Sequence, residues 1–371
     1  MNKIPSHRAI LIALIAILMM SCTPTPIKRD SWGVTKKNES VDCYTLKNKN
    51  GMEVRISTYG GTIISLKTPD KNGRFADVVL GFDKLSDYEE KSPYFGSLIG
   101  RYGNRIGKGV FELNGKSYTL AQNHNGQHLH GGIFGFDKVV WAATRDRGSL
   151  KLTYTSKDGE EGYPGNLRVT ATYSLTENNE LKLLFDAITD QATVCNLTQH
   201  SYFNLSGAET ILDHELQIYG EWMTPINADF VTTGDYLSVE GTPFDFRTPH
   251  RIGERVNASD SQLNIGKGYD HNWVIKKEHD GKLAPMATVY DPISGRVLEV
   301  LSTEPGIQFY GGNFLDGTLK GKGDKIYAFR GGFCLEPQHF PDSPNKPQFP
   351  TVTLNPGISY HHEIIYRFSL R

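Results

Sequence analysis

Alternating hydrophobic and polar positions mark the most regular stretch of the chain, residues 150–187. Leucine, valine and aromatic residues recur there at every second position, in runs separated by Gly/Pro-rich and Asn-Asn segments. A period of two places alternate side chains on opposite faces of a β-strand. The pattern therefore predicts an antiparallel meander with one buried face, with strands over residues 150–154, 167–175 and 181–187.

Shorter patterns extend this picture over most of the chain. Residues 110–120 predict a hairpin, because Asn114-Gly115 is typical of a type I′ turn. Further short strands are expected at 54–56, 63–66, 78–80, 352–354 and 364–366. No long segment keeps a 3.6-residue apolar period, and no Gly-rich phosphate loop links a strand to a helix. The pattern indicates an all-β protein with large packed sheets, and leaves sandwich, barrel and propeller open.

The N-terminal residues have the features of an export signal. Basic residues precede an apolar run over residues 9–20, which is the length of a signal-peptide core and short for a bilayer span. The run ends at Ser21-Cys22, which resembles a bacterial lipoprotein signal whose cysteine becomes lipidated. An ordinary cleaved signal with an incidental cysteine is the alternative. We expect export to the periplasmic side of a bacterial envelope membrane, with a lipid anchor at Cys22.

These features divide the chain into three parts. Residues 1–22 are the signal, residues 23–40 are a tether that begins Thr-Pro-Thr-Pro, and residues 41–371 are one domain. The net charge of −1 gives no reason to expect a nucleic acid or an acidic membrane surface as partner. The cysteines that follow the signal are far apart, so we expect isolated buried thiols and no cysteine-based zinc site.

Several ionisable residues stand in places that need an explanation. Glu336 ends an apolar run, so it is either a salt-bridge partner of an arginine or a general base with a shifted pKa. His200 lies among apolar and aromatic residues and could be a core histidine. The group His124, His128 and His130 has spacing that zinc could use, but no carboxylate partner lies nearby in the sequence, so no metal is predicted.

Taken together, the polar loops resemble the galactose mutarotase (aldose 1-epimerase) family over nearly all of the chain after the signal. The matching segments are GRYGNRI at 100–106, LHGG at 129–132, GFDK at 135–138, GYPG at 162–165, HSYFNL at 200–205, YDHN at 269–272, PGIQFY at 305–310, LEPQ at 335–338 and LNPG at 354–357. Each motif is weak by itself, and their order and spacing are specific. His128 departs from the usual residue of the family.

The resemblance implies a large antiparallel β-sandwich and a cofactor-free exchange of the α and β anomers of a free hexose such as glucose or galactose. It implies that Glu336 is the general base and His200 the general acid. It also implies that the sugar is contacted by Asn104, Arg105, His130, Tyr202, Asp270 and Gln308. The acid must be protonated while the base is ionised, so we expect anionic neighbours or solvent access to keep His200 charged.

Other functions remain open at this point. A glycosidase would use Glu336 and Asp270 as paired carboxylates. A hexose-6-phosphate epimerase would need a cationic phosphate clamp, for which only Arg105 is convincingly placed. A lipid-anchored sugar-binding protein without catalysis would have no need for both Glu336 and His200.

Overall fold

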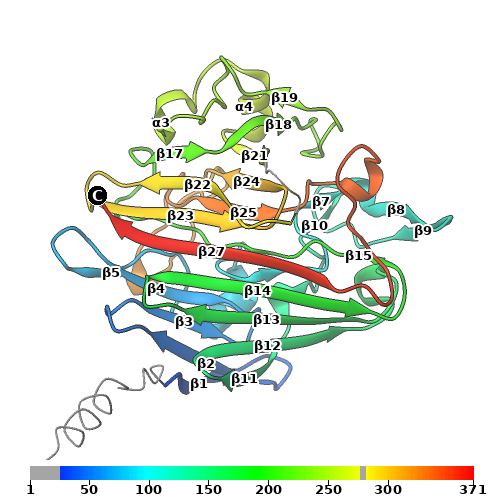
Figure 1. The fold of residues 1–371 in the computed structure, drawn as a ribbon, viewed down its shortest axis with the longest axis horizontal. Coiled ribbons are helices and arrows are strands. Elements are labelled where there is room, and N and C mark those ends of the chain that lie inside the picture. Colours follow the sequence, from blue (N-terminus) through cyan, green and yellow to red (C-terminus); the bar gives the residue numbers. More distant parts are fainter. Residues whose placement is uncertain (1–25, 276–280) are drawn as a thin grey trace, which may run out of the picture.

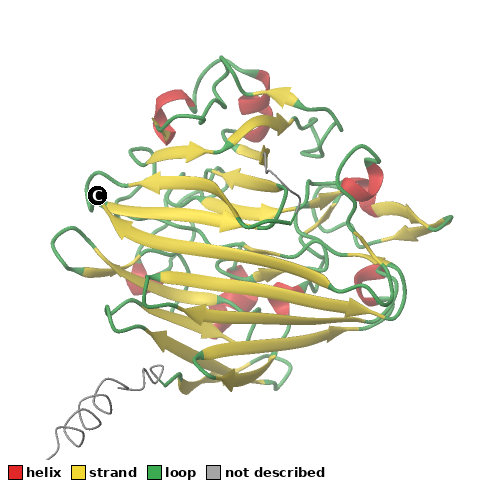
Figure 2. Cartoon of the chain, viewed as in Figure 1, coloured by secondary structure: helices red, strands yellow, loops and turns green. Residues whose placement is uncertain are grey.

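The structure is a computed structural model that describes residues 26–275 and 281–371. Strands dominate it, and the helices are short and peripheral (Figures 1 and 2). Among the described residues, no helix is long and apolar enough to cross a membrane. The predicted signal and the proposed lipidation site at Cys22 lie outside the described residues.

The largest element is an antiparallel sheet of nine strands, which runs across the front of the molecule in Figure 1. Its strands, in spatial order, are β11 (Ala142–Asp146), β12 (Ser149–Ser156), β13 (Leu167–Leu175), β14 (Glu180–Thr189), β27 (Tyr360–Leu370), β23 (Arg296–Ser302), β22 (Ala284–Tyr290), β17 (Glu215–Ile218) and β20 (His250–Arg251). The predicted meander is confirmed as β12, β13 and β14. Leu152, Ala171 and Phe185 are paired across these strands and are all buried, as the period of two requires.

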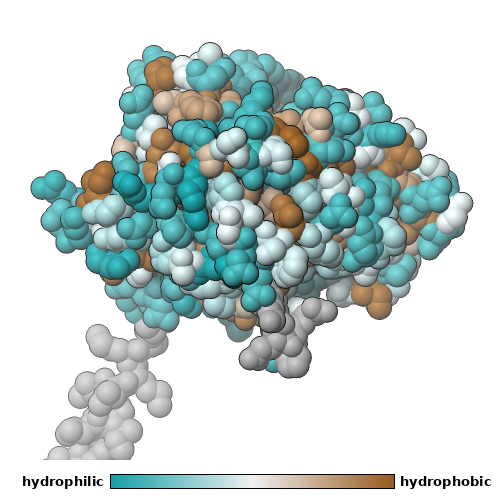
Figure 3. Space-filling model, turned by 90° about the horizontal axis from the view of Figure 1, so that it is seen from above, coloured by the Kyte–Doolittle hydropathy of each residue, from teal (hydrophilic) through white to brown (hydrophobic). Residues whose placement is uncertain are grey.

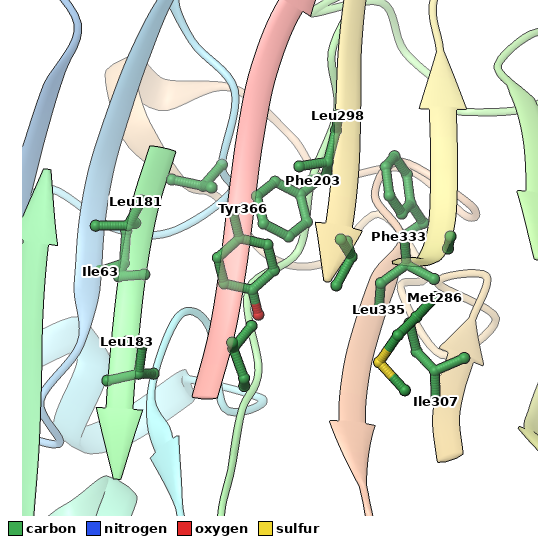
Figure 4. Packing of buried hydrophobic residues seen from close by; sticks show 14 of the residues in the cluster. Ile63, Leu181, Leu183, Phe203, Met286, Leu298, Ile307, Phe333, Leu335 and Tyr366 are labelled. Atoms are coloured by element: carbon green, nitrogen blue, oxygen red, sulfur yellow. The ribbon is translucent and has the colours of Figure 1, made fainter. Parts of the chain in front are cut away.

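Two five-stranded sheets accompany the large sheet. One contains β1 (Lys28–Val34), β2 (Ser40–Lys47), β3 (Glu53–Ser57), β4 (Ile63–Pro69) and β5 (Phe75–Asp77). The other contains β19 (Leu237–Ser238), β18 (Gly220–Thr224), β21 (Asp270–Ile275), β24 (Gly306–Tyr310) and β25 (Cys334–Gln338). Figure 4 shows their side chains packed against those of the large sheet, with Ile63 near Leu181 and Leu335 near Met286. This is the expected all-β sandwich.

Short elements complete the fold. The paired strands are β6 (Leu98–Ile99) with β16 (Thr198–Gln199), β7 (Arg105–Ile106) with β10 (His128–Leu129), β8 (Val110–Leu113) with β9 (Lys116–Thr119), and β15 (Thr193–Val194) with β26 (Thr353–Leu354). The helices are α2 (Leu85–Lys91), α3 (Ile252–Arg255) and α4 (Ser261–Gly266), with 3₁₀ turns at Gly107–Gly109, Phe136–Lys138, Glu160–Gly162, Lys322–Asp324 and Ser343–Asn345. The predicted hairpin is confirmed as β8 and β9.

Two sequence expectations need correction. The predicted tether over residues 23–40 is wrong in part, because β1 (Lys28–Val34) pairs with β2 at the edge of its sheet. Its side chains are mostly half-buried or exposed, which left little apolar pattern to recognise. The predicted strand at 78–80 is reduced to a single bridge between Val79 and Phe203.

The cysteines after the signal behave as expected, since Cys43, Cys195 and Cys334 are buried and free. The outer surface is mainly hydrophilic in the view of Figure 3, where apolar residues are scattered and do not merge into one large patch.

Candidate active site

Three neighbouring strands, β21, β24 and β25, place polar side chains on one buried face of their five-stranded sheet. Gln308 on β24 lies directly opposite Glu336 on β25, and opposite Asn272 on β21. Asp270 lies two residues before Asn272 and therefore shares its face. Nearly every residue of these strands is buried on both sides. The polar row is thus held rigidly inside the sandwich.

The opposite wall comes from short strand pairs and the loops after them. His200 follows β16, and its backbone N–H donates to the carbonyl of Ser97 at 3.0 Å. Arg105 lies on β7, whose partner β10 is followed directly by His130. Both Asn104 and His130 have positive φ angles, 63° and 50°, in the left-handed region. His130 therefore turns away from the strand direction, and His128 and His130 do not share one strand face as their spacing suggested.

These elements enclose a pocket of about 190 Å³. Its lining includes nearly all the residues that the sequence singled out: Asn104, Arg105, His130, His200, Tyr202, Asp270 and Glu336. Gln308 is not part of this lining. It contacts a residue that is, because its side-chain amide donates to Asp270 Oδ1 at 2.7 Å. Two larger hollows, of about 500 and 670 Å³, lie elsewhere, and neither contains His200 or Glu336.

The acid and base candidates meet in this pocket. His200 Nε2 lies 3.6 Å from Glu336 Oε1, and both side chains are almost fully buried. Burial raises the pKa of Glu336 well above its ordinary range; the neighbouring charge of Asp270 adds to this effect and that of Arg105 opposes it. Burial lowers the pKa of His200 to about 4. Burial thus disfavours the charged form of both groups, the carboxylate of Glu336 and the imidazolium of His200.

This result corrects the expectation that His200 is kept charged. Its side chain is buried, and Cys334 Sγ, a weak hydrogen-bond partner, lies 3.5 Å from its Nδ1. Glu336 is the carboxylate in contact with it, and burial disfavours the charged form of that group as well. The protonated imidazole is thus a higher-energy state, which becomes populated when a proton moves from Glu336 to His200.

Several buried polar atoms in and beside the pocket have no hydrogen-bond partner among the described residues. They are Arg105 Nε, Gln308 Oε1 and Glu336 Oε2. Buried polar groups are normally paired, so such atoms indicate a polar ligand that completes them. The Arg105 guanidinium lies 5.2 Å from the Phe230 ring centre. This cation–π contact orients the guanidinium without occupying its N–H donors, as an ion pair with a carboxylate would.

A further cluster within the pocket could suggest a metal ion. The nearest ligand atoms of His130, His200 and Glu336 all lie within 4.8 Å of one another. However, His130 Nδ1 accepts the backbone N–H of Asn104 at 3.1 Å, so in the neutral ring the proton is on Nε2. Metal-bound histidines show the reverse arrangement, in which the second ring nitrogen donates a proton. These residues therefore do not fit a metal ion, and they do provide an N–H donor to the pocket.

The alternative metal group, His124 with His128 and His130, is not formed. Both ring nitrogens of His128 have protein partners, the carbonyl of Ala121 at 2.7 Å and the hydroxyl of Tyr163 at 2.6 Å. His128 is thus a structural residue of the core.

Sequence reasoning missed several residues of the pocket. Tyr94, Tyr310 and Phe314 line it, and Tyr94 lies in a Ser-Pro-Tyr-Phe-Gly loop. Its position between proline and glycine beside aromatic residues was the one available signal.

The all-β sandwich brings a carboxylate and an imidazole into contact in one buried pocket, an arrangement suited to an enzyme that uses acid–base chemistry. A family model described as aldose 1-epimerase matches residues 42–367. The chain is 46% identical to the galactose mutarotase of Homo sapiens over 321 residues, which cover 86% of this chain and 92% of the relative. It is 36% identical to the aldose 1-epimerase of Escherichia coli (strain K12) over 328 residues, which cover 87% and 94% of the two chains. The chain belongs to the aldose 1-epimerase family.

Solved structures agree with this assignment. A homologue of aldose epimerase from C. elegans has a TM-score of 0.82 and 31% identity, covering 88% of this chain and 98% of that one. The galactose 1-epimerase of Lactobacillus acidophilus NCFM has a TM-score of 0.80 and 28% identity, with coverage of 93% and 99%.

Proposed function

We propose that this enzyme interconverts the α and β anomers of a free hexose such as glucose or galactose, with Glu336 as base and His200 as acid. The observation that carries the proposal is the 3.6 Å contact between His200 Nε2 and Glu336 Oε1 inside one pocket. A sugar whose anomeric hydroxyl and ring oxygen face these two groups can be opened and closed without a cofactor.

Ring opening requires two proton transfers and one bond cleavage. The Glu336 carboxylate takes the proton of the anomeric hydroxyl O1 while the His200 imidazolium gives a proton to the ring oxygen O5. The C1–O5 bond breaks and the C1–O1 carbonyl forms. Half a turn about the C1–C2 bond then presents the other face of the aldehyde, and the same transfers in reverse close the ring.

The effect of burial on the two groups suits this cycle. After opening, Glu336 is protonated and His200 is neutral, which is the arrangement that burial favours. The ionised pair needed for opening is less stable, and the buried charge of Arg105 favours the carboxylate form of Glu336.

The remaining residues orient the sugar. His130 donates from Nε2, Arg105 donates its free N–H groups, and Asp270 accepts from sugar hydroxyls while Gln308 holds it in place. Asn104 Oδ1 already accepts the N–H of Arg105, which leaves its amide nitrogen as a donor. The aromatic ring of Tyr202 stacks on His200 at 5.2 Å.

The rival functions find less support. Arg105 is the single permanent cation in the described lining of the pocket, which is a poor clamp for a sugar phosphate. A sugar-binding protein without catalysis would have no use for a buried pair that exchanges a proton.

Polarimetry or NMR of freshly dissolved α-D-glucose and α-D-galactose tests the proposal. The wild-type enzyme should accelerate mutarotation, and Glu336→Gln and His200→Ala should each reduce kcat by about 10²-fold or more. Lys320→Gln, which removes an exposed ion pair, serves as a control and should retain activity. Full activity in Glu336→Gln would overturn the base assignment, and release of sugar from an aryl glycoside would favour a glycosidase.

We further propose that the enzyme is exported and anchored by a lipid at Cys22, on the periplasmic side of a bacterial membrane. The apolar run before Ser21-Cys22 supports this idea. Because Ile27 is buried in the core and β1 begins at Lys28, the folded domain starts before the predicted tether ends. Incorporation of a labelled fatty acid should disappear in Cys22→Ala; equal labelling of the two forms, or a cytoplasmic location of the wild type, would contradict the proposal.

A further inference from the structure

Tyr94, like Tyr310 and Phe314, lines the pocket without a role in the proposed mechanism. Tyr94 lines the pocket at the tip of the loop before β6, and its φ angle is 68°, in the left-handed region. A bulky residue pays a conformational cost there, and such costs persist where the surrounding structure imposes them. The position of Tyr94 is therefore imposed by its neighbours.

The loop that carries Tyr94 is built on the backbone of His200. The N–H of Gly96 donates to the carbonyl of His200 at 2.9 Å, and the N–H of His200 donates to the carbonyl of Ser97 at 3.0 Å. The hydroxyl of Tyr202 donates to the carbonyl of Pro93 at 3.1 Å. The loop and His200 thus keep a fixed relative position.

This arrangement sets the ring of Tyr94 against both histidines. Its centre lies 5.7 Å from that of His200 with an angle of 31° between the planes, and 4.7 Å from that of His130. Lys138 Nζ lies 5.6 Å from the same ring centre. The electron-rich face of an aromatic ring attracts a nearby cation, most strongly where water is excluded.

We propose that Tyr94 is a positioning residue for the acid: its ring fixes the imidazole of His200 and stabilises its protonated form when the sugar is opened. The inference rests on the proposed role of His200. Burial opposes the imidazolium form of His200, and the aromatic ring offsets part of this cost. Unlike a further carboxylate, the ring does so without binding the proton itself.

Other groups also face His200 and must be considered in any titration. They are Glu336 and Cys334 from β25, His130 after β10, and the rings of Tyr94 and Tyr202. Glu336 is the anionic candidate among them, and His130 is neutral because burial lowers its pKa well below the ordinary value. Substitution of Tyr94 leaves these groups in place.

The test compares Tyr94→Leu with Tyr94→Phe, which keeps the ring. Tyr94→Leu should lower kcat about 3- to 30-fold with little change in KM, whereas Tyr94→Phe should stay within about 2-fold of wild type. NMR titration of the His200 ring should show a lower pKa in Tyr94→Leu only. Tyr219→Leu, at an exposed tyrosine outside the pocket lining, controls for the loss of any tyrosine.

Each outcome decides the inference. A rise in KM at constant kcat would make Tyr94 a simple wall of the sugar site and overturn the proposal, as would an unchanged His200 titration in Tyr94→Leu. If Tyr94→Leu does not fold, Tyr94→Phe and Tyr94→Trp carry the test, and a kcat loss in Tyr94→Phe as large as that of His200→Ala would also contradict it. Failure of the whole proposed function is distinguished by His200→Ala, which would then retain full activity.

Discussion

Glu304 and His339 form an ion pair at the ends of the two strands that carry Gln308 and Glu336. Glu304 precedes β24, His339 follows β25, and the hydroxyl of Tyr360 also donates to Glu304 at 3.3 Å. The carboxylate is buried, so it depends on these partners. The pair therefore links the ends of β24 and β25, the strands that position Gln308 and Glu336.

Removing that charge should destabilise the protein. Glu304→Gln removes the buried charge and weakens the hydrogen bonds that the carboxylate accepts, so it should lower the free energy of unfolding by about 1.5–3 kcal/mol. Urea denaturation followed by circular dichroism measures the change. Lys320→Gln, which breaks an exposed pair with Asp324, is the matched control and should change stability by less than about 1 kcal/mol. Equal effects in the two variants would contradict the role given to Glu304.

The pH dependence of catalysis should reflect the shared proton of the acid–base pair. Because burial lowers the pKa of His200 to about 4 and raises that of Glu336, the pair keeps one proton through the mildly acidic range. We expect kcat/KM, corrected for the spontaneous reaction, to stay nearly constant from about pH 5 to about pH 7 and to fall below about pH 4. A limb near the ordinary pKa of free histidine would show instead that His200 titrates as an exposed group.

Asp137 should make stability fall as the pH rises. Burial raises its pKa from the ordinary 3.8 to about 6, so the folded state binds this proton more tightly than the unfolded state. Its contribution to stability is greatest at low pH and is lost as pH rises through about 6. At about 1.4 kcal/mol per pKa unit, the loss is about 3 kcal/mol. Unfolding of Asp137→Asn at several pH values should lack this component, and the exposed Asp213→Asn should retain it.

Two glycines near His130 provide a matched pair for testing the loop. Both have positive φ angles, 85° at Gly131 and 76° at Gly126. A Cβ on Gly131 would lie 1.7 Å from the carbonyl oxygen of Gly100, whereas one on Gly126 would meet nothing within 4 Å. Gly126→Ala should cost about 1 kcal/mol, because only the backbone angle is unfavourable. Gly131→Ala should cost clearly more in thermal unfolding and should reduce activity by moving His130; equal costs would refute this close approach.

The sequence predicted β12, β13, β14 and part of β27 in the large sheet, but no strand of the sheet that contains β24 and β25, and there is a physical reason for the difference. β13 has one buried face, so its apolar residues alternate and the pattern is visible. β24 and β25 are buried on both faces, so their sequences show no alternation. The polar residues they carry were found through the family resemblance and not through periodicity.

The candidate site shows the same limit at the level of single residues. Glu336 and His200 were recognised, and the structure brings them together. The low pKa of His200 could not be predicted, because burial by distant segments has no local signal. Tyr94 was missed because its contacts with His130 and His200 depend on a left-handed backbone angle and on a loop paired to a remote part of the chain.

The position of β27 in the middle of the nine-stranded sheet has a consequence for biosynthesis. It lies between β14 and β23, yet it follows every other strand along the chain. When all the earlier strands have been synthesised, the central strand of the sheet is therefore still missing. The part that ends at β14 and the part that begins at β23 cannot pair through β27 until residues 360–370 have been made. Completion of the sheet therefore waits for β27, whichever half forms first.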